Sequence, residues 1–184
     1  MPRKAPEAIL LVDGYNVIGA WADLKAISDR EGLEEARRTL VERLLSYSAA
    51  NDYETELVFD SHYQETPGSR ERLNSYFSIY YTDFRQSADT YIEWVCSQYR
   101  YDIRKHSQRL IVATSDRVHQ QTVQGYGANW ISAQQLRTDV ECTTVRVRHR
   151  QKQPKKSSGR FLARSLDPVA QQRLAEMRKG LNLE

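Results

Sequence analysis

The segment LLVDGYNVIGAW, residues 10–21, decides how this chain folds. Its apolar start, together with Ala8 and Ile9, predicts a short buried β-strand over residues 8–12. Asp13-Gly14 then predicts a tight turn at the end of that strand. An acidic residue therefore stands directly after the first predicted strand.

The same pattern of a strand followed by a helix recurs along the chain. Further strands are predicted at 55–59 (TELVF), 76–82 (YFSIYYT), 109–114 (RLIVAT) and 128–131 (ANWI). Helices are predicted at 33–50, from Ala88 with Ser87 as its cap, after Asp116 with an end near Gly125 or Gly127, and at 133–141 with Ser132 as its cap. The polar residues 61–74 are predicted to be a loop. Four alternations of strand and helix predict an α/β protein with a parallel sheet and helices on both faces.

The pattern breaks at Thr143. Residues 143–166 contain eight Lys or Arg residues and no acid, and Pro154 and Gly159 interrupt them, so we predict a loose linker. Asp167-Pro168 is then expected to open a last helix that ends at Gly180. The sequence thus predicts a globular domain over 8–142 and a basic linker with a C-terminal helix over 143–184.

The charge is unevenly divided between these two parts. The net charge of the chain is +3, whereas residues 143–184 carry +8 and the preceding residues therefore carry −5. A basic extension on an acidic body indicates a polyanionic partner, and the alternative of an extension that only aids solubility stays open. The candidate RNA-binding residues are Arg146, Arg148, Arg150, Lys152, Lys155 and Lys156. The alternation in Val145–Arg148 predicts a strand with both arginines on one face.

Several classes of protein are disfavoured. The apolar run at residues 9–12 is far too short to span a bilayer, and the N-terminus has no apolar stretch of signal-peptide length, so we expect a cytoplasmic protein. Cys96 and Cys142 lack zinc-binding spacing and are expected to be reduced and buried. The sequence has no P-loop, dinucleotide fingerprint or GxSxG motif, so no organic cofactor is expected.

Acidic residues occupy the positions where an open α/β sheet binds its ligands, just outside the carboxyl ends of the strands. Asp13, Asp60 and Asp116 each directly follow a predicted strand, Asp89 lies in the first turn of a predicted helix, and Glu93 follows one helical turn later. A single acid at such a place is usually a helix cap. Four together predict a site for Mg²⁺ or Mn²⁺, because crowded carboxylates repel one another and oxygen ligands suit these ions.

The histidines give little support to a different chemistry. His62, His106, His119 and His149 form no obvious pair in the sequence, so a ribonuclease that uses two histidines as acid and base is disfavoured. Each histidine is expected to be either hydrogen-bonded within the fold or exposed to solvent.

Four segments in the same order resemble a known family. LLVDGYNVIGAW (10–21), LVFD (57–60), SADTYIE (87–93) and VATSD (112–116) resemble the YacP-like nucleases of the NYN domain family, within the PIN-like superfamily. The resemblance implies a PIN-like three-layer α/β/α fold with a central parallel sheet in the order 3-2-1-4-5. It also implies that Asp13, Asp89 and Asp116 are catalytic metal ligands. Asp60 is a further metal-ligand candidate, and Asn16, Glu93 and Ser115 are supporting residues.

The function implied by the resemblance is that of a metal-dependent endoribonuclease. It would hydrolyse RNA phosphodiester bonds with Mg²⁺ or Mn²⁺, in mRNA decay, and the ribosome is a candidate partner. Asn16 or Ser115 is expected to hold a phosphate oxygen of the RNA or a water molecule. A non-catalytic RNA- or ribosome-binding module is the alternative. The intact acids favour the enzyme, because an acidic pocket would repel the RNA that a pure binding module must hold.

Overall fold

The centre of the fold is a six-stranded sheet in which β1 is a middle strand. The computed structural model describes residues 5–60 and 67–152. Within them the strands are β1 (Ala8–Asp13), β2 (Tyr53–Phe59), β3 (Ser69–Asn74), β4 (Phe77–Tyr81), β5 (Arg109–Ala113) and β6 (Asn129–Ile131). Their order across the sheet is β3-β4-β2-β1-β5-β6, and all neighbouring pairs are parallel except β3 with β4.

The edge strand β3 corrects the sequence prediction. The five predicted strands stand in the expected relative order, but residues 69–74 form a sixth, antiparallel strand where a loop was predicted. Most of β3 is exposed, and its sequence SRERLN has no apolar alternation that could reveal a strand. Charged side chains on such an edge are common, because they discourage pairing with another sheet.

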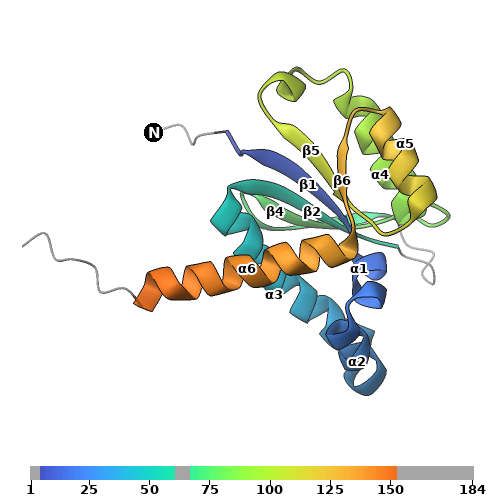
Figure 1. Cartoon of the computed structure of the whole chain (residues 1–184). Helices are drawn as coiled ribbons and strands as arrows, with labels where there is room; N and C mark the ends of the chain where they lie inside the picture. The colour runs from blue at the N-terminus through green and yellow to red at the C-terminus, as the bar shows by residue number, and fades with distance from the viewer. Residues whose placement is uncertain (1–4, 61–66, 153–184) are drawn as a thin grey trace, which may run out of the picture. The chain divides into compact units, whose positions relative to one another are not determined.

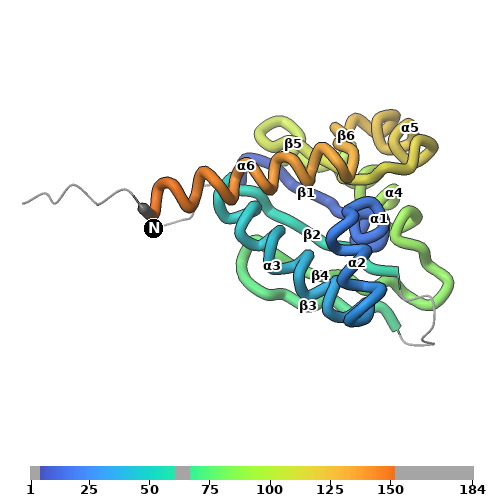
Figure 2. Tube along the Cα trace, turned by 60° about the horizontal axis from the view of Figure 1, so that its bottom comes forward, coloured from blue at the N-terminus to red at the C-terminus, as the bar shows by residue number. Residues whose placement is uncertain are grey.

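Helices cover both faces of the sheet, which confirms the three-layer α/β/α class (Figure 1). They are α1 (Gly14–Ala20), α2 (Ala22–Glu31), α3 (Leu33–Asn51), α4 (Ala88–Tyr99), α5 (Arg117–Gly125) and α6 (Ala133–Lys152), with a short 3₁₀ helix η1 (Ile103–His106). Alternate residues of β1 serve the two layers, as a central strand requires. Leu10 and Val12 pack with α1, α3 and α6, whereas Ile9 and Leu11 pack with α4 and α5. Figure 2 shows α1, α2 and α3 grouped together.

The segment after β1 is helical from its first residue, so the predicted tight turn at Asp13-Gly14 is wrong. Gly14 is required there because a Cβ atom would overlap the ring of Phe59. Further along the segment, Trp21 is fully buried and its indole Nε1 donates a hydrogen bond to the carbonyl of Ala133, at 2.7 Å. The decisive segment therefore fixes both the end of β1 and the start of α6.

The predicted helix caps are confirmed. The Ser87 hydroxyl accepts a hydrogen bond from the backbone N–H of Thr90 at 3.1 Å, and the Ser132 hydroxyl accepts one from Gln135 at 3.1 Å. Such caps satisfy backbone donors that have no partner within the helix. The Ser87 cap fixes where α4 begins and hence where Asp89 stands.

The region after residue 142 differs most from its prediction. Helix α6 continues to Lys152, so residues 143–152 are not a linker, and the strand predicted over 145–148 is wrong. Arg146 and Arg148 therefore cannot share one face, since residues two apart on a helix point in nearly opposite directions. Thr143 is buried, and Arg146 donates to the side chain of Asn51 at 3.2 Å, which ties this turn of the helix to α3.

The chain divides into two compact units, Met1–Val147 and Arg148–Glu184. The helix predicted from Asp167 and the candidates Lys155 and Lys156 lie outside the described residues, and the domain boundary at 142/143 stays a prediction. Cys96 is buried as expected, whereas Cys142 is exposed on α6. None of the described helices is both long and apolar enough to cross a membrane.

Candidate functional site

The carboxyl ends of the parallel strands meet at one edge of the sheet. In the strand register Asp13 is the partner of Val58, two residues before Asp60, and Val12 is the partner of Ala113, three residues before Asp116. Asp13 is the last residue of β1 and the N-cap of α1, where its carboxylate accepts a hydrogen bond from the backbone N–H of Asn16 at 3.1 Å. The sheet thus delivers three predicted acids to the same edge.

Three of the four predicted aspartates line one open pocket at this edge. Asp13 comes from the end of β1, Asp60 follows β2, and Asp89 lies in the first turn of α4. The remaining lining residues are Tyr15, Asn16, Ser87 and Ala88. Asp60 also accepts a long hydrogen bond, 3.4 Å, from the hydroxyl of Thr82. Residues far apart in the sequence therefore form a concave, oxygen-rich surface.

Asp13 is the electrostatically unusual member of this group. The pKa of its carboxyl is raised to about 6, mainly by burial and in smaller part by the charges of Asp89 and Asp60. The hydrogen bond from Asn16 and the charge of His119 act in the opposite direction. A carboxylate that is both desolvated and beside like charges is costly to ionise, and a bound cation would offset that cost.

Asp89 has a histidine beneath it that the sequence pattern did not single out. The Nδ1 atom of His119 lies 2.9 Å from Oδ1 of Asp89. This contact with the imidazole lowers the pKa of Asp89 despite the opposing effect of burial. His119 is only 3% exposed, so it belongs to the interior side of the site and does not line the pocket. The signal in the sequence was its place three residues after Asp116, in the first turn of a helix that begins at this edge.

Asp116 has a different role in this structure. It is the N-cap of α5, and its carboxylate accepts hydrogen bonds from the backbone N–H groups of Val118 at 2.7 Å and His119 at 3.2 Å. Its side chain is exposed and is not among the residues that line the pocket with Asp13. The sheet places Asp116 at the expected edge, but its carboxylate is engaged in capping.

The supporting residues link the loops of the site. The Asn16 side-chain oxygen accepts a hydrogen bond from the backbone N–H of Ser115 at 2.9 Å, which joins the loops after β1 and β5. The Ser115 hydroxyl accepts one from Ala133 at 3.1 Å, at the start of α6. Asn16 also lines the pocket, whereas Ser115 does not. Glu93 is half-buried, and its charge acts on His119.

The residues present fit a hard divalent cation by their chemistry. Carboxylate oxygens dominate the pocket lining and no thiol contributes, which is the donor set that Mg²⁺ and Mn²⁺ prefer. The pKa of Asp13 is raised chiefly because burial disfavours its charged form, which a bound cation would favour. Among residues 5–60 and 67–152, however, no three His, Cys, Asp or Glu side chains stand close enough to enclose an ion as they are.

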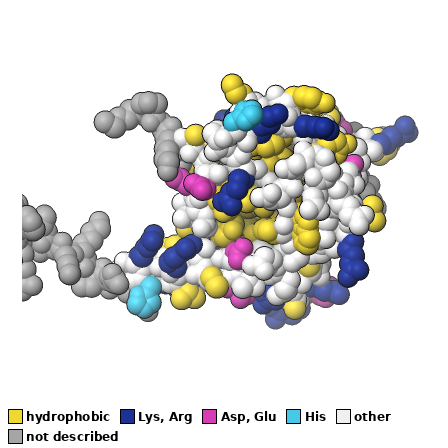
Figure 3. Space-filling view, turned by 45° about the horizontal axis from the view of Figure 1, so that its top comes forward, with side chains coloured by type: hydrophobic (Ala, Val, Ile, Leu, Met, Phe, Trp, Pro, Cys, Tyr) yellow, Lys and Arg dark blue, Asp and Glu magenta, His cyan; other side chains and the backbone are white. Residues whose placement is uncertain are grey.

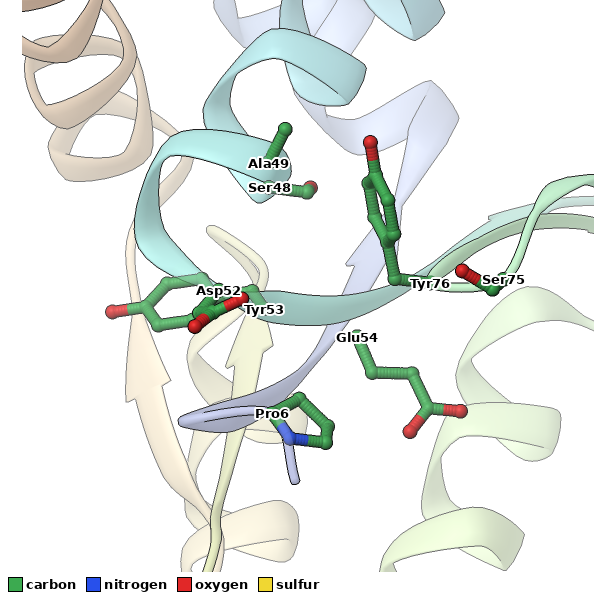
Figure 4. A pocket seen from close by; sticks show the side chains of 8 residues that line it. All are labelled: Pro6, Ser48, Ala49, Asp52, Tyr53, Glu54, Ser75 and Tyr76. Atoms are coloured by element: carbon green, nitrogen blue, oxygen red, sulfur yellow. The ribbon is translucent and has the colours of Figure 1, made fainter. Parts of the chain in front are cut away.

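A second pocket lies at the opposite edge of the sheet, at the amino ends of the strands. Figure 4 shows its lining, which comes from the segment before β1, the end of α3, the start of β2 and the turn before β4. Its acids are Asp52 and Glu54, and none of the predicted site residues lines it. At about 80 Å³ it is smaller than the pocket beside Asp13, which measures about 210 Å³.

The basic candidates in the described part of α6 are exposed and do not form one stripe. Arg146, Arg148 and Arg150 are all exposed, and Arg146 is partly engaged by Asn51 and Thr143. Lys152 ends the helix. Figure 3 shows other Lys and Arg side chains scattered over the face that it displays, with Asp and Glu between them.

Comparisons with known proteins agree on one family. A family model described as the YacP-like NYN domain matches residues 10–179. The YacP protein of Bacillus subtilis (strain 168) is 32% identical over 142 residues, which cover 77% of this chain and 80% of that protein. The crystal structure of Rae1 (YacP) from Bacillus subtilis matches with a TM-score of 0.64 and 29% identity, over 94% of this chain and 95% of that one. The crystal structure of a tryptophan-to-leucine mutant of the same Bacillus protein matches with a TM-score of 0.66 and 27% identity, over 92% and 99%.

Proposed function

This chain belongs to the YacP-like NYN domain family, whose fold is of the nuclease type, and we propose that it is a metal-dependent endoribonuclease that hydrolyses RNA phosphodiester bonds. One observation supports this most strongly. Asp13, Asp60 and Asp89 line a single pocket at the carboxyl edge of the sheet, and the pKa of Asp13 is raised there to about 6. A pocket that gathers three carboxylates suits a cation that in turn binds phosphate.

Asp13 and Asp89 are the proposed principal ligands of Mg²⁺ or Mn²⁺, with Asp60 and Asp116 as further ligands. When bound, the ion would polarise phosphoryl oxygens, activate water and neutralise the leaving oxygen. Asp13 is held by its own cap to α1, so its carboxylate is positioned before any ligand arrives. Oδ1 of Asp116 accepts the hydrogen bonds that cap α5, so Asp116 could bind an ion mainly through its other carboxylate oxygen.

The chain's own polar groups would orient the substrate. The oxygen of the Asn16 side chain is occupied by Ser115, so the amide nitrogen is the atom that could donate to a phosphate oxygen. The start of α4 lies at the same pocket, with Ser87 and Ala88 in the lining. The N-terminus of a helix favours anions, because its dipole is positive and its first N–H groups point outward.

The substrate we propose is mRNA, with the ribosome as a candidate partner and RNA decay as the role. The body of the chain is net negative, so RNA needs an attractive surface outside the pocket. Residues 143–184 carry +8, and the exposed Arg148 and Arg150 belong to them. A long basic segment of this kind suits a large structured RNA, because contacts to phosphates position a nucleic acid without reading its sequence.

The experiment that tests this function is an internal-cleavage assay with labelled RNA. Purified protein is incubated with RNA and Mn²⁺, Mg²⁺ or EDTA, alongside Asp13→Asn and the control Asp29→Asn, an exposed aspartate on α2. We expect internal cuts with metal, none with EDTA, and loss of cleavage in Asp13→Asn alone. Wild-type protein that binds RNA but leaves it intact with both metals would instead indicate a non-catalytic RNA- or ribosome-binding module.

A further inference from the structure

His119 is a buried histidine in an acidic setting. It lies in the first turn of α5, and its backbone N–H is fixed by the cap from Asp116 at 3.2 Å. Its residue surface is 3% exposed, although three acids, Asp89, Glu93 and Asp13, exert charge on its ring. Burying an imidazole costs free energy unless its nitrogens find partners, so an apolar side chain would be the simpler way to fill this space.

The polar atoms around His119 are incompletely satisfied. Nδ1 of the ring is 2.9 Å from Oδ1 of Asp89, which is a hydrogen-bonding distance, but the ring N–H is not aligned with that oxygen. Within the described residues, both ring nitrogens and Oδ1 of Asp89 are buried without an aligned hydrogen-bond partner. Buried polar atoms without a partner are rare in folded proteins, so this pair calls for an explanation, and a role in the site is one.

The two oxygens of Asp89 face different surroundings. Oδ1 is buried against His119, whereas the Asp89 side chain as a whole is 47% exposed and lines the pocket with Asp13. The exposed surface of Asp89 therefore lies on its other side-chain atoms, and Oδ2 is the carboxylate oxygen that His119 does not contact. His119 thus contacts Oδ1 of Asp89 and leaves Oδ2 available to a ligand in the pocket.

We propose that His119 is a positioning residue of the site, which holds Asp89 through Oδ1 so that Oδ2 is presented to a cation in the pocket. This inference rests on the proposed metal-dependent function and adds a residue to it. Carboxylates that bind metals are themselves commonly held by hydrogen bonds, and removing such a partner costs roughly 10- to 100-fold in metal affinity or activity.

The same contacts give Asp116 an indirect route to the site. Its carboxylate fixes the first turn of α5 through the N–H groups of Val118 and His119. That turn sets the position of the imidazole, and the imidazole contacts Asp89. An acid that is absent from the pocket lining can therefore influence the pocket through a chain of three side chains.

The test compares variants that keep or remove the donor at the Nδ1 position. His119→Leu fills similar space without a donor, whereas the amide nitrogen of His119→Asn can occupy nearly the place of Nδ1. His106→Leu, at an exposed histidine on η1, is the control. The primary readout is the Mn²⁺ dissociation constant of the metal-free full chain by calorimetry, supported by kcat and KM for RNA and by thermal melting.

We expect His119→Leu to weaken Mn²⁺ binding roughly 10- to 100-fold. His119→Asn should restore it to within a few fold of wild type, and His106→Leu should match wild type. The loss in cleavage should appear in kcat and not in KM for RNA. A folded His119→Leu protein with wild-type Mn²⁺ affinity would overturn the inference, as would a His119→Asn protein as impaired as His119→Leu.

The experiments distinguish failure of the proposed role of His119 from failure of the proposed nuclease function. Mn²⁺ binding that depends on His119 in a protein that cuts no RNA would sustain this inference and reject the nuclease. Metal-dependent cleavage that is unchanged in His119→Leu would support the nuclease and reject this role of His119. If His119→Leu does not fold, ¹⁵N NMR of the imidazole decides: Asp89→Asn should shift the Nδ1 resonance of His119, and an unchanged resonance would overturn the contact.

Discussion

Each edge of the parallel sheet has a pocket with acidic residues. Three aspartates line the pocket at the carboxyl edge, whereas Asp52 and Glu54 line the one at the amino edge. At the carboxyl edge Asp13 is partly buried, and the charges of Asp89 and Asp60 act on it. At the amino edge Asp52 is exposed and ends α3 in a left-handed conformation with φ of 58°. Asp52 therefore has a local role in ending a helix, whereas the carboxyl-edge acids act on one another.

Helix direction explains much of this difference. Helices α1, α4 and α5 all begin just after the carboxyl edge, at Gly14, Ala88 and Arg117, whereas α3 ends at the amino edge. Helix N-termini stabilise negative charge and helix C-termini do not. The carboxyl edge can therefore hold several carboxylates and, through a bound cation, attract an anionic substrate. The position of an acid in the fold thus decides its role more than its charge does.

The largest difference between the two edges is expected when one charge is removed from each. Asp13→Asn should reduce metal-dependent RNA cleavage by ~100-fold or more, because an amide cannot replace a charged ligand. Asp52→Asn, which keeps the left-handed conformation that Asn tolerates, should cleave at the wild-type rate. Rates from labelled RNA under single-turnover conditions measure both, and equal losses in the two variants would show that the edges do not differ.

The second prediction concerns stability without metal. The pKa of Asp13 in the folded protein, about 6, is above its ordinary value of 3.8, so the protonated form is favoured by folding. Its stabilising contribution is complete below pH ~4 and is lost as the pH rises through 6, up to ~3 kcal/mol in all.

Asp13→Asn should therefore be more stable than wild type at pH 7.5 in EDTA, and the gap should close near pH 4. Urea unfolding at the two pH values measures this difference, with Asp52→Asn expected to stay within ~0.5 kcal/mol of wild type. A metal-free wild type that is more stable than Asp13→Asn at pH 7.5 would mean that the charge of Asp13 is already compensated.

The third prediction separates the two possible roles of Asp116. Asp116→Ala should cost ~1 kcal/mol of stability through the lost cap, whereas Asp116→Asn can still cap α5. If the charge also serves the site, Asp116→Asn should lose cleavage roughly tenfold while melting as wild type does. Full activity of Asp116→Asn would make this acid a cap and nothing more.

The smallest effect is expected far from the pocket, in the basic residues of α6. Replacing Arg146, Arg148, Arg150 and Lys152 by Gln should weaken RNA binding several-fold and flatten its dependence on salt, since fewer counterions are released. Cleavage positions should stay the same, because phosphate contacts do not read sequence. Affinity measured at several salt concentrations tests this, and an unchanged slope would assign these residues to solubility or to a protein partner.

The sequence predicted the parts of the fold that rest on apolar patterning. The central strand at 8–12, the helix from Ala88 and the caps at Ser87 and Ser132 all follow from periodicity and from side chains that bond to nearby backbone. The edge strand β3 was not predicted, because its exposed charged residues do not alternate with apolar ones. The continuation of α6 over residues 143–152 was not predicted, because the run of basic residues was interpreted as a linker. Arg and Lys are nevertheless good helix formers.

The site was predictable as an edge of the sheet but not as a set of contacts. The acids that follow strands, Asp13 and Asp60, and the acid in the first turn of a helix, Asp89, do line one pocket as the sequence predicted. It could not show that the carboxylate of Asp116 caps α5, because a cap and a ligand look alike in sequence. It also passed over His119, because the sequence does not show that α5 buries this ring against α4.

An anomalous diffraction map from crystals soaked in Mn²⁺ would show directly whether the carboxyl-edge pocket binds the ion. We predict a manganese peak in the carboxyl-edge pocket, within coordinating distance of oxygens from Asp13 and Asp89, and no peak at the amino-edge pocket of Figure 4. Crystals saturated with Mn²⁺ that show no ion beside Asp13, while the same protein cleaves RNA, would contradict the account.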